Sequence, residues 1–289
     1  MSYSPDTGLA YIPSVEMPGF YTDKGMKLQE WQSPYFAFDP AIDTIRDDVP
    51  ANAGTGALRA WDPLKQQVAW EVPLPGMWNP GTLATRGNLV FQGRSDGRFV
   101  AYRASDGEPL WQVELGSGIS APPVTYEVDG IQYVSLLMGW GGTGSSMVGS
   151  LAAQHGWAYK SQTRRLFTFA LNGEQPLPAF NPPRFATPID DPAFKVDDAL
   201  VEKGSWLFKE SCMMCHGAGA VSGGYAPDLR ASPIPLVAEA FKDVVVNGKL
   251  RHNGMPDFKE FSDAQLETLQ HFIRAKARVP TSTNATAAH

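Results

Sequence analysis

The residues most capable of chemistry lie close together near residue 215. The 289-residue chain contains two cysteines, Cys212 and Cys215, and His216 follows them directly. This Cys-x-x-Cys-His spacing is typical of covalent c-type haem attachment. Two thiols one helical turn apart can each add to a haem vinyl group, and the adjacent imidazole can then ligate the iron. We therefore predict thioether bonds from Cys212 and Cys215 to haem c, with His216 as an axial iron ligand.

The sixth iron ligand should be a Met or His that approaches from the opposite side. The segment Asn253-Gly254-Met255-Pro256 supplies a candidate, and Met255 lies 39 residues beyond His216, as in a small cytochrome. Proline restricts the backbone and glycine permits close approach to the ring. We predict Met255 as the second axial ligand, with His252 as the competitor and His271 as a solvated residue on a helix face. A His/Met pair favours electron transfer.

Two other uses of the cysteine pair are weaker. A zinc site needs four ligands, and the chain has no further cysteine to supply a second pair. A thioredoxin-like redox pair would require a βαβ context, which the surrounding pattern lacks.

The first 174 residues contain an internal repeat. Gly56 to Trp70 superposes on Gly97 to Trp111 after a shift of 41 residues. A period of roughly 40–50 residues with strand-like segments is the signature of propeller blades, each a four-stranded sheet. We expect two full blades with pieces at either end. Since a closed propeller needs at least four blades, this chain is not expected to close a ring by itself.

Turn and strand signals support this prediction. Pro5-Asp6-Thr7-Gly8 should be the turn of an N-terminal hairpin, and Asp129-Gly130 is a strong hairpin signal. Further strand-like runs occupy 81–85, 88–93, 122–126, 131–137 and 166–171. The expected fold class is therefore an all-β partial propeller followed by a small all-α cytochrome c domain.

The composition changes at about residue 174. We assign blades to residues 1–174, a Pro-rich, semi-rigid linker to 175–196, a cytochrome c domain to 197–280 and a disordered polar tail to 281–289. We expect three helices in the predicted cytochrome c domain. The first begins at about Asp197, the second spans Leu236 to Val246, and the third begins with a capping box at Ser262. The last helix should bury one face, formed by Leu266, Leu269, Phe272 and Ile273.

Charge and hydropathy exclude several classes of partner. Acidic residues outnumber basic ones by 30 to 24, which disfavours nucleic acid. The sequence has no apolar run of 18 residues, so we expect no transmembrane segment. The first dozen residues do not form a secretory signal. Because bacteria attach haem c outside the cytoplasm, we predict a periplasmic protein whose export signal belongs to a missing N-terminal part.

A propeller with tryptophan-bearing repeats, a Pro-rich linker and a C-terminal cytochrome c resembles the quinohaemoprotein alcohol dehydrogenases, which are PQQ-dependent enzymes. The segment from Ala101 to Trp111 is similar to the tryptophan-docking motif of this family, in which Ala and Trp lock neighbouring blades together. The preceding repeat has Lys65-Gln66-Gln67 where Gly usually stands, so its turn is expected to differ.

The resemblance also implies elements of a PQQ pocket. The segment 78–85 is similar to the stretch whose Trp packs near the quinone, although Pro80 stands where Gly is usual. The segment 139–142 resembles the loop that closes over the substrate. Trp78, Asn79 and Trp140 are therefore candidate pocket residues. The alternative is that these tryptophans, like most of the eight in the chain, pack between blades.

In the family, the calcium ligands and the aspartate base precede the region matched here. The resemblance thus implies no catalytic residue in this chain, and we expect Asp23, Asp39, Asp62 and Asp96 to be turn residues. The implied function is the C-terminal part of a periplasmic enzyme that oxidises alcohols through PQQ and calcium. Electrons would leave through haem c to a cupredoxin, another cytochrome or a quinone.

Two alternatives remain open from the sequence. The chain could be a stand-alone electron-transfer cytochrome c that carries a non-catalytic propeller remnant. It could also be an interaction module whose blades complete the ring of another subunit, since exposed strand edges can pair with another chain.

Overall fold

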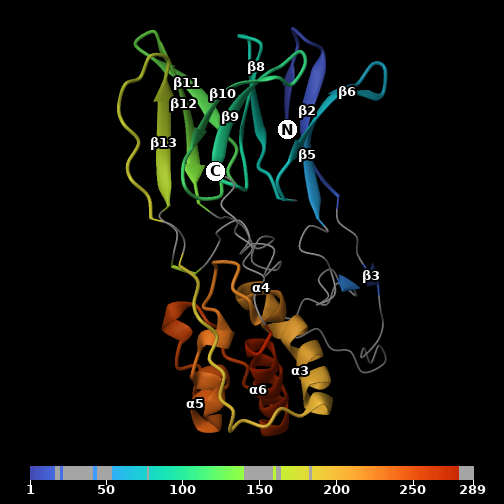
Figure 1. Ribbon diagram of the computed structural model, residues 1–289, viewed down its shortest axis with the longest axis vertical. Coiled ribbons are helices and arrows are strands. Elements are labelled where there is room, and N and C mark those ends of the chain that lie inside the picture. The colour runs from blue at the N-terminus through green and yellow to red at the C-terminus, as the bar shows by residue number, and fades with distance from the viewer. Residues whose placement is uncertain are drawn as a thin grey trace.

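The computed structural model describes residues 1–16, 20–21, 42–43, 54–76, 78–139, 159–160, 164–181 and 184–279. Three antiparallel sheets form one end of the molecule and the helices form the other (Figure 1). Within these residues no helix is both long enough and apolar enough to cross a bilayer.

The first sheet has four strands in the order β1-β2-β5-β6. Its strands are β1 (Ser2–Ser4), β2 (Leu9–Glu16), β5 (Thr55–Asp62) and β6 (Gln67–Leu74). The predicted N-terminal hairpin is confirmed, but it is not a separate piece of a blade. Because β2 pairs with β5 along its length, the hairpin completes the first repeat as a full blade. A short pair, β3 (Phe20–Tyr21) with β4 (Ile42–Asp43), lies within the long β2–β5 connection.

The second sheet has the order β10-β9-β8-β7 and the third β11-β12-β13. Their strands are β7 (Thr82–Thr85), β8 (Leu89–Gly93), β9 (Arg98–Arg103), β10 (Pro109–Glu114), β11 (Val124–Val128), β12 (Ile131–Met138) and β13 (Arg165–Ala170). The predicted hairpin turn joins β11 and β12, with positive φ angles of 53° at Asp129 and 77° at Gly130. Positive φ at both central residues is the geometry that matches the twist of a tight hairpin.

The 41-residue repeat sets the packing between the sheets. Leu58 and Leu74 are buried in a core shared by the first and second sheets. Their counterparts one repeat later, Phe99 and Leu115, are buried between the second and third sheets. Equivalent positions therefore build successive interfaces of the same kind, as expected of propeller blades.

A tryptophan links the first two blades. The Trp70 indole N–H donates a 3.0 Å hydrogen bond to the Ala104 carbonyl, which also accepts a 3.0 Å bond from the Tyr11 hydroxyl. Gly107 lies against the same indole, because a Cβ there would stand 2.6 Å from a Trp70 ring carbon. One repeat earlier, Gln66 has φ 54° where Gly107 has φ 81°. Gln66 thus adopts the same left-handed conformation as Gly107 without being glycine.

Trp111, the counterpart of Trp70, contacts the third sheet. Its ring meets Phe99 and Phe169 edge to face, with centroid separations of 5.9 and 5.5 Å. Edge-to-face pairs of this kind add stability beyond the area they bury.

Among the described residues, four α-helices and four short 3₁₀ turns lie at the other end of the molecule. The α-helices are α3 (Asp198–Ser211), α4 (Met213–His216), α5 (Ala238–Val245) and α6 (Asp263–Ala277), and the 3₁₀ turns are η1 (Ala218–Ala220), η2 (Leu229–Ala231), η3 (Ile234–Leu236) and η4 (Arg251–Asn253). The capping box predicted at Ser262 is present and pairs with Gln265. The predicted apolar face of α6 is buried.

Helices α3 and α6 cross at close range. A Cβ on Gly204 would stand 2.0 Å from the Thr268 carbonyl oxygen, so only glycine fits at this crossing. Beside it, the rings of Phe208 and Phe272 pack with centroids 4.9 Å apart. This crossing anchors the hydrophobic core of the helical part.

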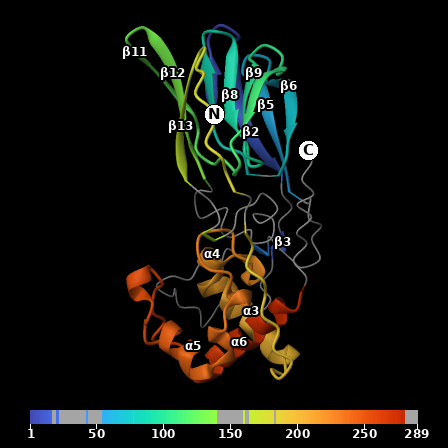
Figure 2. The ribbon, with the colours of Figure 1, turned by 60° about the vertical axis from the view of Figure 1, so that its left-hand side comes forward.

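The linker between the two parts is bound to the helices. The chain passes from β13 alongside the helices to the start of α3 (Figures 1 and 2). Asp197 N–H donates to His271 Nδ1 at 2.9 Å, and the Phe194 and His271 rings pack with centroids 4.9 Å apart. His271 is therefore a structural residue, which corrects the expectation that it is merely solvated.

The contact between Gly107 and Trp70 generates a stability prediction. Gly107→Ala should lower the free energy of unfolding by about 2–4 kcal/mol. Alanine is disfavoured in the left-handed backbone conformation of this position, and its Cβ would clash with the indole. Gly130→Ala is the matched control, because Gly130 has φ 77° and no atom within 4 Å of its would-be Cβ. In the control, the free energy of unfolding should fall only by the backbone cost of about 1–2 kcal/mol. Urea denaturation followed by circular dichroism measures both, and equal losses would refute the docking role of Trp70.

Candidate functional site

The cysteine motif lies in one helical turn where α3 ends and α4 begins. Cys212 N–H donates to the Phe208 carbonyl at 2.8 Å, and the Cys212 carbonyl accepts from His216 N–H at 2.9 Å. Cys212 thus ends one helix and starts the next. The turn holds Cys212, Cys215 and His216 within one helical repeat, as the predicted attachment chemistry requires.

His216 is buried and its ring is oriented by a backbone carbonyl. The side chain is 8% exposed, and Nδ1 lies 2.9 Å from the Pro227 carbonyl oxygen. A carbonyl can only accept, so Nδ1 carries the hydrogen and Nε2 keeps its lone pair. Burial lowers the pKa of His216, while the hydrogen bond to Pro227 and the charge of Asp228 oppose that shift. The imidazole is therefore neutral at pH 7, which is the form that ligates a metal.

The thiols of the motif are in their neutral form. Burial raises the pKa of the Cys212 thiol to about 12, with Cys215 adding to the shift, and burial also raises the pKa of Cys215. Neither thiol is thus poised as the free thiolate that a redox pair uses. A thioether carries no charge, so this buried environment fits covalent haem attachment better than a redox pair. Among the described residues, no three His, Cys, Asp or Glu side chains are grouped to hold a metal ion.

Met255 and the attachment turn border the same hydrophobic core. Both Met255 and Cys212 are partly buried and pack against it. Met255 follows Gly254, whose φ of 89° turns the chain after η4. Downstream, Phe258 N–H donates to the Val245 carbonyl at 2.8 Å, which ties this segment to the end of α5. His252, the competing ligand, is exposed instead. The role of Met255 as an iron ligand stays a prediction.

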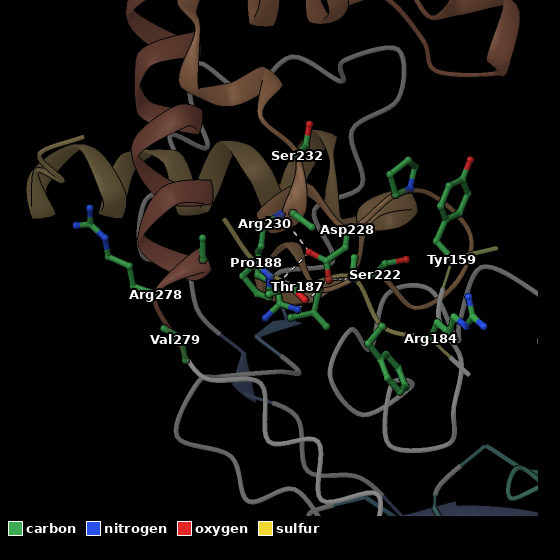
Figure 3. A pocket seen from close by; sticks show the side chains of 16 residues that line it. Tyr159, Arg184, Thr187, Pro188, Ser222, Asp228, Arg230, Ser232, Arg278 and Val279 are labelled. Carbon is green, nitrogen blue, oxygen red and sulfur yellow. Dashed lines mark hydrogen bonds and ion pairs between the residues drawn. The ribbon is translucent and has the colours of Figure 1, made fainter. Parts of the chain in front are cut away.

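A partly buried loop holds the Pro227 carbonyl against His216. Within it, Ser222 Oγ donates to the Ala226 carbonyl at 2.5 Å and accepts from Gly224 N–H at 3.0 Å. The Asp228 carboxylate accepts from Arg230 Nη2 at 2.8 Å and lies beside Ser222 (Figure 3). The sequence does not indicate the role of these residues, because their hydrogen-bond partners are not evident from residue type alone. The only available signal was the run of small residues directly after the cysteine motif.

A cavity of about 920 Å³ adjoins this loop. Its lining comes from the loop, the linker, the end of α6 and Tyr159, which lies between β12 and β13 in the sequence. In Figure 3, Arg184 and Tyr159 lie on one side of the Asp228–Arg230 pair and Arg278 lies on the other. Its wall includes Pro227, so the cavity stands next to the group that orients His216.

Two of the three predicted quinone-pocket residues, Trp78 and Asn79, lie in the described part of the chain. Trp78 is 39% exposed. The Asn79 amide donates to the Gly76 carbonyl and accepts from Ser95 N–H, both at 3.2 Å, so its polar atoms hold a turn. Trp140 lies outside the described residues. The donor set of the cysteine motif fits haem c, and the roles of Trp78, Asn79 and Trp140 in a PQQ pocket stay predictions.

The acidic residues behave as predicted where the structure describes them. The Asp62 carboxylate accepts from the backbone N–H groups of Leu64 and Lys65, both at 3.0 Å. The Asp96 carboxylate accepts from Arg98 N–H at 3.2 Å. Both are therefore turn residues. Asp23 and Asp39 lie outside the described residues, as does the predicted tail at 281–289.

Two family models match the chain. Residues 6–134 match the model described as glucose/ethanol/alcohol dehydrogenase, beta-propeller domain. Residues 199–273 match that of cytochrome C oxidase, cbb3-type, subunit III. Together these matches confirm the predicted fold class of propeller blades followed by a cytochrome c domain.

Curated relatives are similar to the chain over nearly all of its length. It is 41% identical to quinohemoprotein alcohol dehydrogenase ADH IIB of Pseudomonas putida, covering 96% of this chain and 39% of the relative. It is 36% identical to 1-butanol dehydrogenase (cytochrome c) of Thauera butanivorans, covering 96% and 40%. The chain thus spans about two fifths of the length of these relatives.

Solved structures of quinohemoprotein alcohol dehydrogenases are also similar to the chain. Quinohemoprotein alcohol dehydrogenase ADHIIG of Pseudomonas putida superposes with a TM-score of 0.82 at 38% identity, covering 96% of this chain and 40% of that one. The enzyme from Comamonas testosteroni gives a TM-score of 0.72 at 34% identity, with the same coverage.

The Ser222 hydrogen bonds generate a prediction for the loop. Ser222→Ala removes the donor to Ala226 and the acceptor for Gly224, and should cost about 1–3 kcal/mol of unfolding free energy because buried groups lose their partners. Ser105→Ala, at an exposed serine, is the control and should change stability by less than about 0.5 kcal/mol. Urea denaturation of the two variants compares them, and an unchanged midpoint for Ser222→Ala would show that the loop does not depend on this hydroxyl.

Proposed function

The chain belongs to the quinohaemoprotein alcohol dehydrogenase family, of whose members it spans about two fifths, and we propose that it forms the electron-exit part of such an enzyme. The observation that carries this proposal is the Cys-x-x-Cys-His turn, with a buried neutral His216 held by the Pro227 carbonyl. Sequence similarity to both a propeller model and a cytochrome model supports it.

In this proposal Cys212 and Cys215 hold haem c through thioethers, and His216 and Met255 ligate its iron. Bound haem supplies one-electron transfer. The Pro227 carbonyl fixes the ring orientation and tautomer of His216, as partners of a ligating histidine do. The core beneath the turn, which includes Phe208 and Phe272, keeps water away from the attachment site. Low solvent access favours electron transfer over oxygen chemistry at the iron.

The reaction of the complete enzyme is also part of the proposal. An alcohol would be oxidised through PQQ, with calcium and the catalytic base contributed by residues outside this chain. The electrons would then pass to haem c and on to a periplasmic acceptor, which could be a cupredoxin, a cytochrome or a quinone. We place the blades at residues 1–174, the linker at 175–196 and the cytochrome c domain at 197–280.

One observation favours the second candidate, a stand-alone electron-transfer cytochrome c. In the described part of the chain the haem-attachment turn is assembled, whereas Trp78 is 39% exposed and the Asn79 amide holds a turn. Both candidate functions include haem c. They differ in whether electrons taken from an alcohol reach it.

Haem attachment is the first prediction of this proposal. Exported with haem-maturation machinery, the chain should gain the mass of one haem that resists acid–acetone extraction. Cys212→Ser and Cys215→Ser should each leave one thioether, and the double variant should lose covalent haem altogether. Ser105→Ala is the control and should load fully. A wild-type chain that folds but takes up no covalent haem would contradict the proposal.

Alcohol-dependent reduction separates the two candidates. Supplied with PQQ, calcium and a primary alcohol, the haem-loaded chain alone should stay oxidised, because the catalytic base is placed outside it, while ascorbate should reduce it. Addition of the remaining propeller part should restore reduction by alcohol, as absorbance spectroscopy would show. Reduction by alcohol in the chain alone would show that its own residues complete the catalytic site, and a failure to restore it would favour the stand-alone cytochrome.

A further inference from the structure

Two charged side chains are buried beside the loop that carries Asp228. Arg274 on α6 is 2% exposed and Arg230 is 4% exposed. Burying charged groups is costly unless they are paired and hydrogen-bonded. Two buried guanidinium groups near the Asp228 carboxylate therefore need a reason.

The one carboxylate is committed to Arg230. The Asp228 Oδ1 and Oδ2 atoms accept from Arg230 Nε at 3.0 Å and Nη2 at 2.8 Å, a bidentate pair. Figure 3 shows this pair at the centre of the cavity wall. Its two charges cancel each other, so the pair leaves the surroundings close to neutral.

Arg274 has a different set of partners. Its Nη2 donates to the Leu229 carbonyl at 2.7 Å and its Nη1 to the Ile189 carbonyl at 3.3 Å. Its Nε has no hydrogen-bond partner among the described residues. All of these acceptors are neutral carbonyls. Burial lowers the pKa of Arg274 and Asp228 opposes the shift, but a guanidinium keeps its proton in proteins. The cluster of Asp228, Arg230 and Arg274 thus carries one positive charge in excess.

This charge is connected to the haem ligand through a few atoms of backbone. Arg274 binds the Leu229 carbonyl, and two residues earlier the Pro227 carbonyl accepts from His216. Asp228, between them, acts electrostatically on both His216 and Arg274. His216 and Arg274 are themselves buried, at 8% and 2% exposure, and charges interact more strongly at buried sites than in water.

We propose that Arg274 is a positioning residue that raises the reduction potential of the haem by holding an uncompensated positive charge behind His216. The inference rests on the proposed electron-exit function. Reduction of the iron adds one electron and no proton, so it lowers the charge of the site by one. A fixed buried cation stabilises the reduced form relative to the oxidised one, and Arg274 also braces the loop that presents the Pro227 carbonyl.

The test is a redox titration of the haem-loaded chain and three variants. Arg274→Gln removes the charge and should lower the midpoint potential. Arg274→Lys keeps the charge with different hydrogen bonds and should retain most of the wild-type potential. Arg278→Gln is the matched control, because Arg278 lies one turn further along, is exposed and pairs with Asp190. Solvent and salt screen an exposed charge, so this variant should leave the potential unchanged.

The outcomes separate this inference from the proposed function. Covalent haem with no shift in Arg274→Gln, or an equal fall in Arg274→Gln and Arg274→Lys, would overturn the inference and leave the function intact. Absence of covalent haem in the wild type would overturn the function itself. If Arg274→Gln fails to fold, Asp228→Asn tests the inference instead. Removing the negative carboxylate should raise the midpoint potential of the haem. An unchanged or lower potential in Asp228→Asn would overturn the inference.

Discussion

The hydrogen bond between His216 Nδ1–H and the Pro227 carbonyl is the constraint on which the helical part depends. It selects one tautomer, leaves Nε2 available and fixes the ring plane. A carbonyl can do this only if its own loop is rigid. The structure supplies that rigidity from several directions, since Ser222 closes the loop from within and Arg274 binds it from α6. The linker adds a further tie, through Ile189 N–H to the Arg230 carbonyl at 2.9 Å.

These ties bind the linker to the helical part of the molecule. The linker does not act as a loose tether, because α6 binds it at His271, Arg274 and Arg278, which lie three and four residues apart on one helix face. At the other end, the sheets are locked by contacts such as that of Trp70 with Gly107.

Much of this arrangement follows from local sequence signals. The cysteine motif, the Ser262 capping box, the Asp129-Gly130 turn and the 41-residue repeat each depend on neighbouring residues, so the sequence predicts them. Other features depend on residues far apart in the chain. The pairing of β2 with β5 spans a long connection, and the contact between Asp197 and His271 joins two helices. A buried arginine such as Arg274 looks like an ordinary polar residue of an amphipathic helix until its partners are known.

Direct detection of the His216 ring proton tests the central claim. In the reduced, haem-loaded chain with ¹⁵N-labelled histidine, proton–nitrogen NMR should show an Nδ1–H of His216 that exchanges slowly with water, while Nε2 binds the iron. Cross-relaxation to protons next to the Pro227 carbonyl would place the hydrogen bond where the structure has it. A freely exchanging Nδ1–H, or iron bound through Nδ1, would contradict the account.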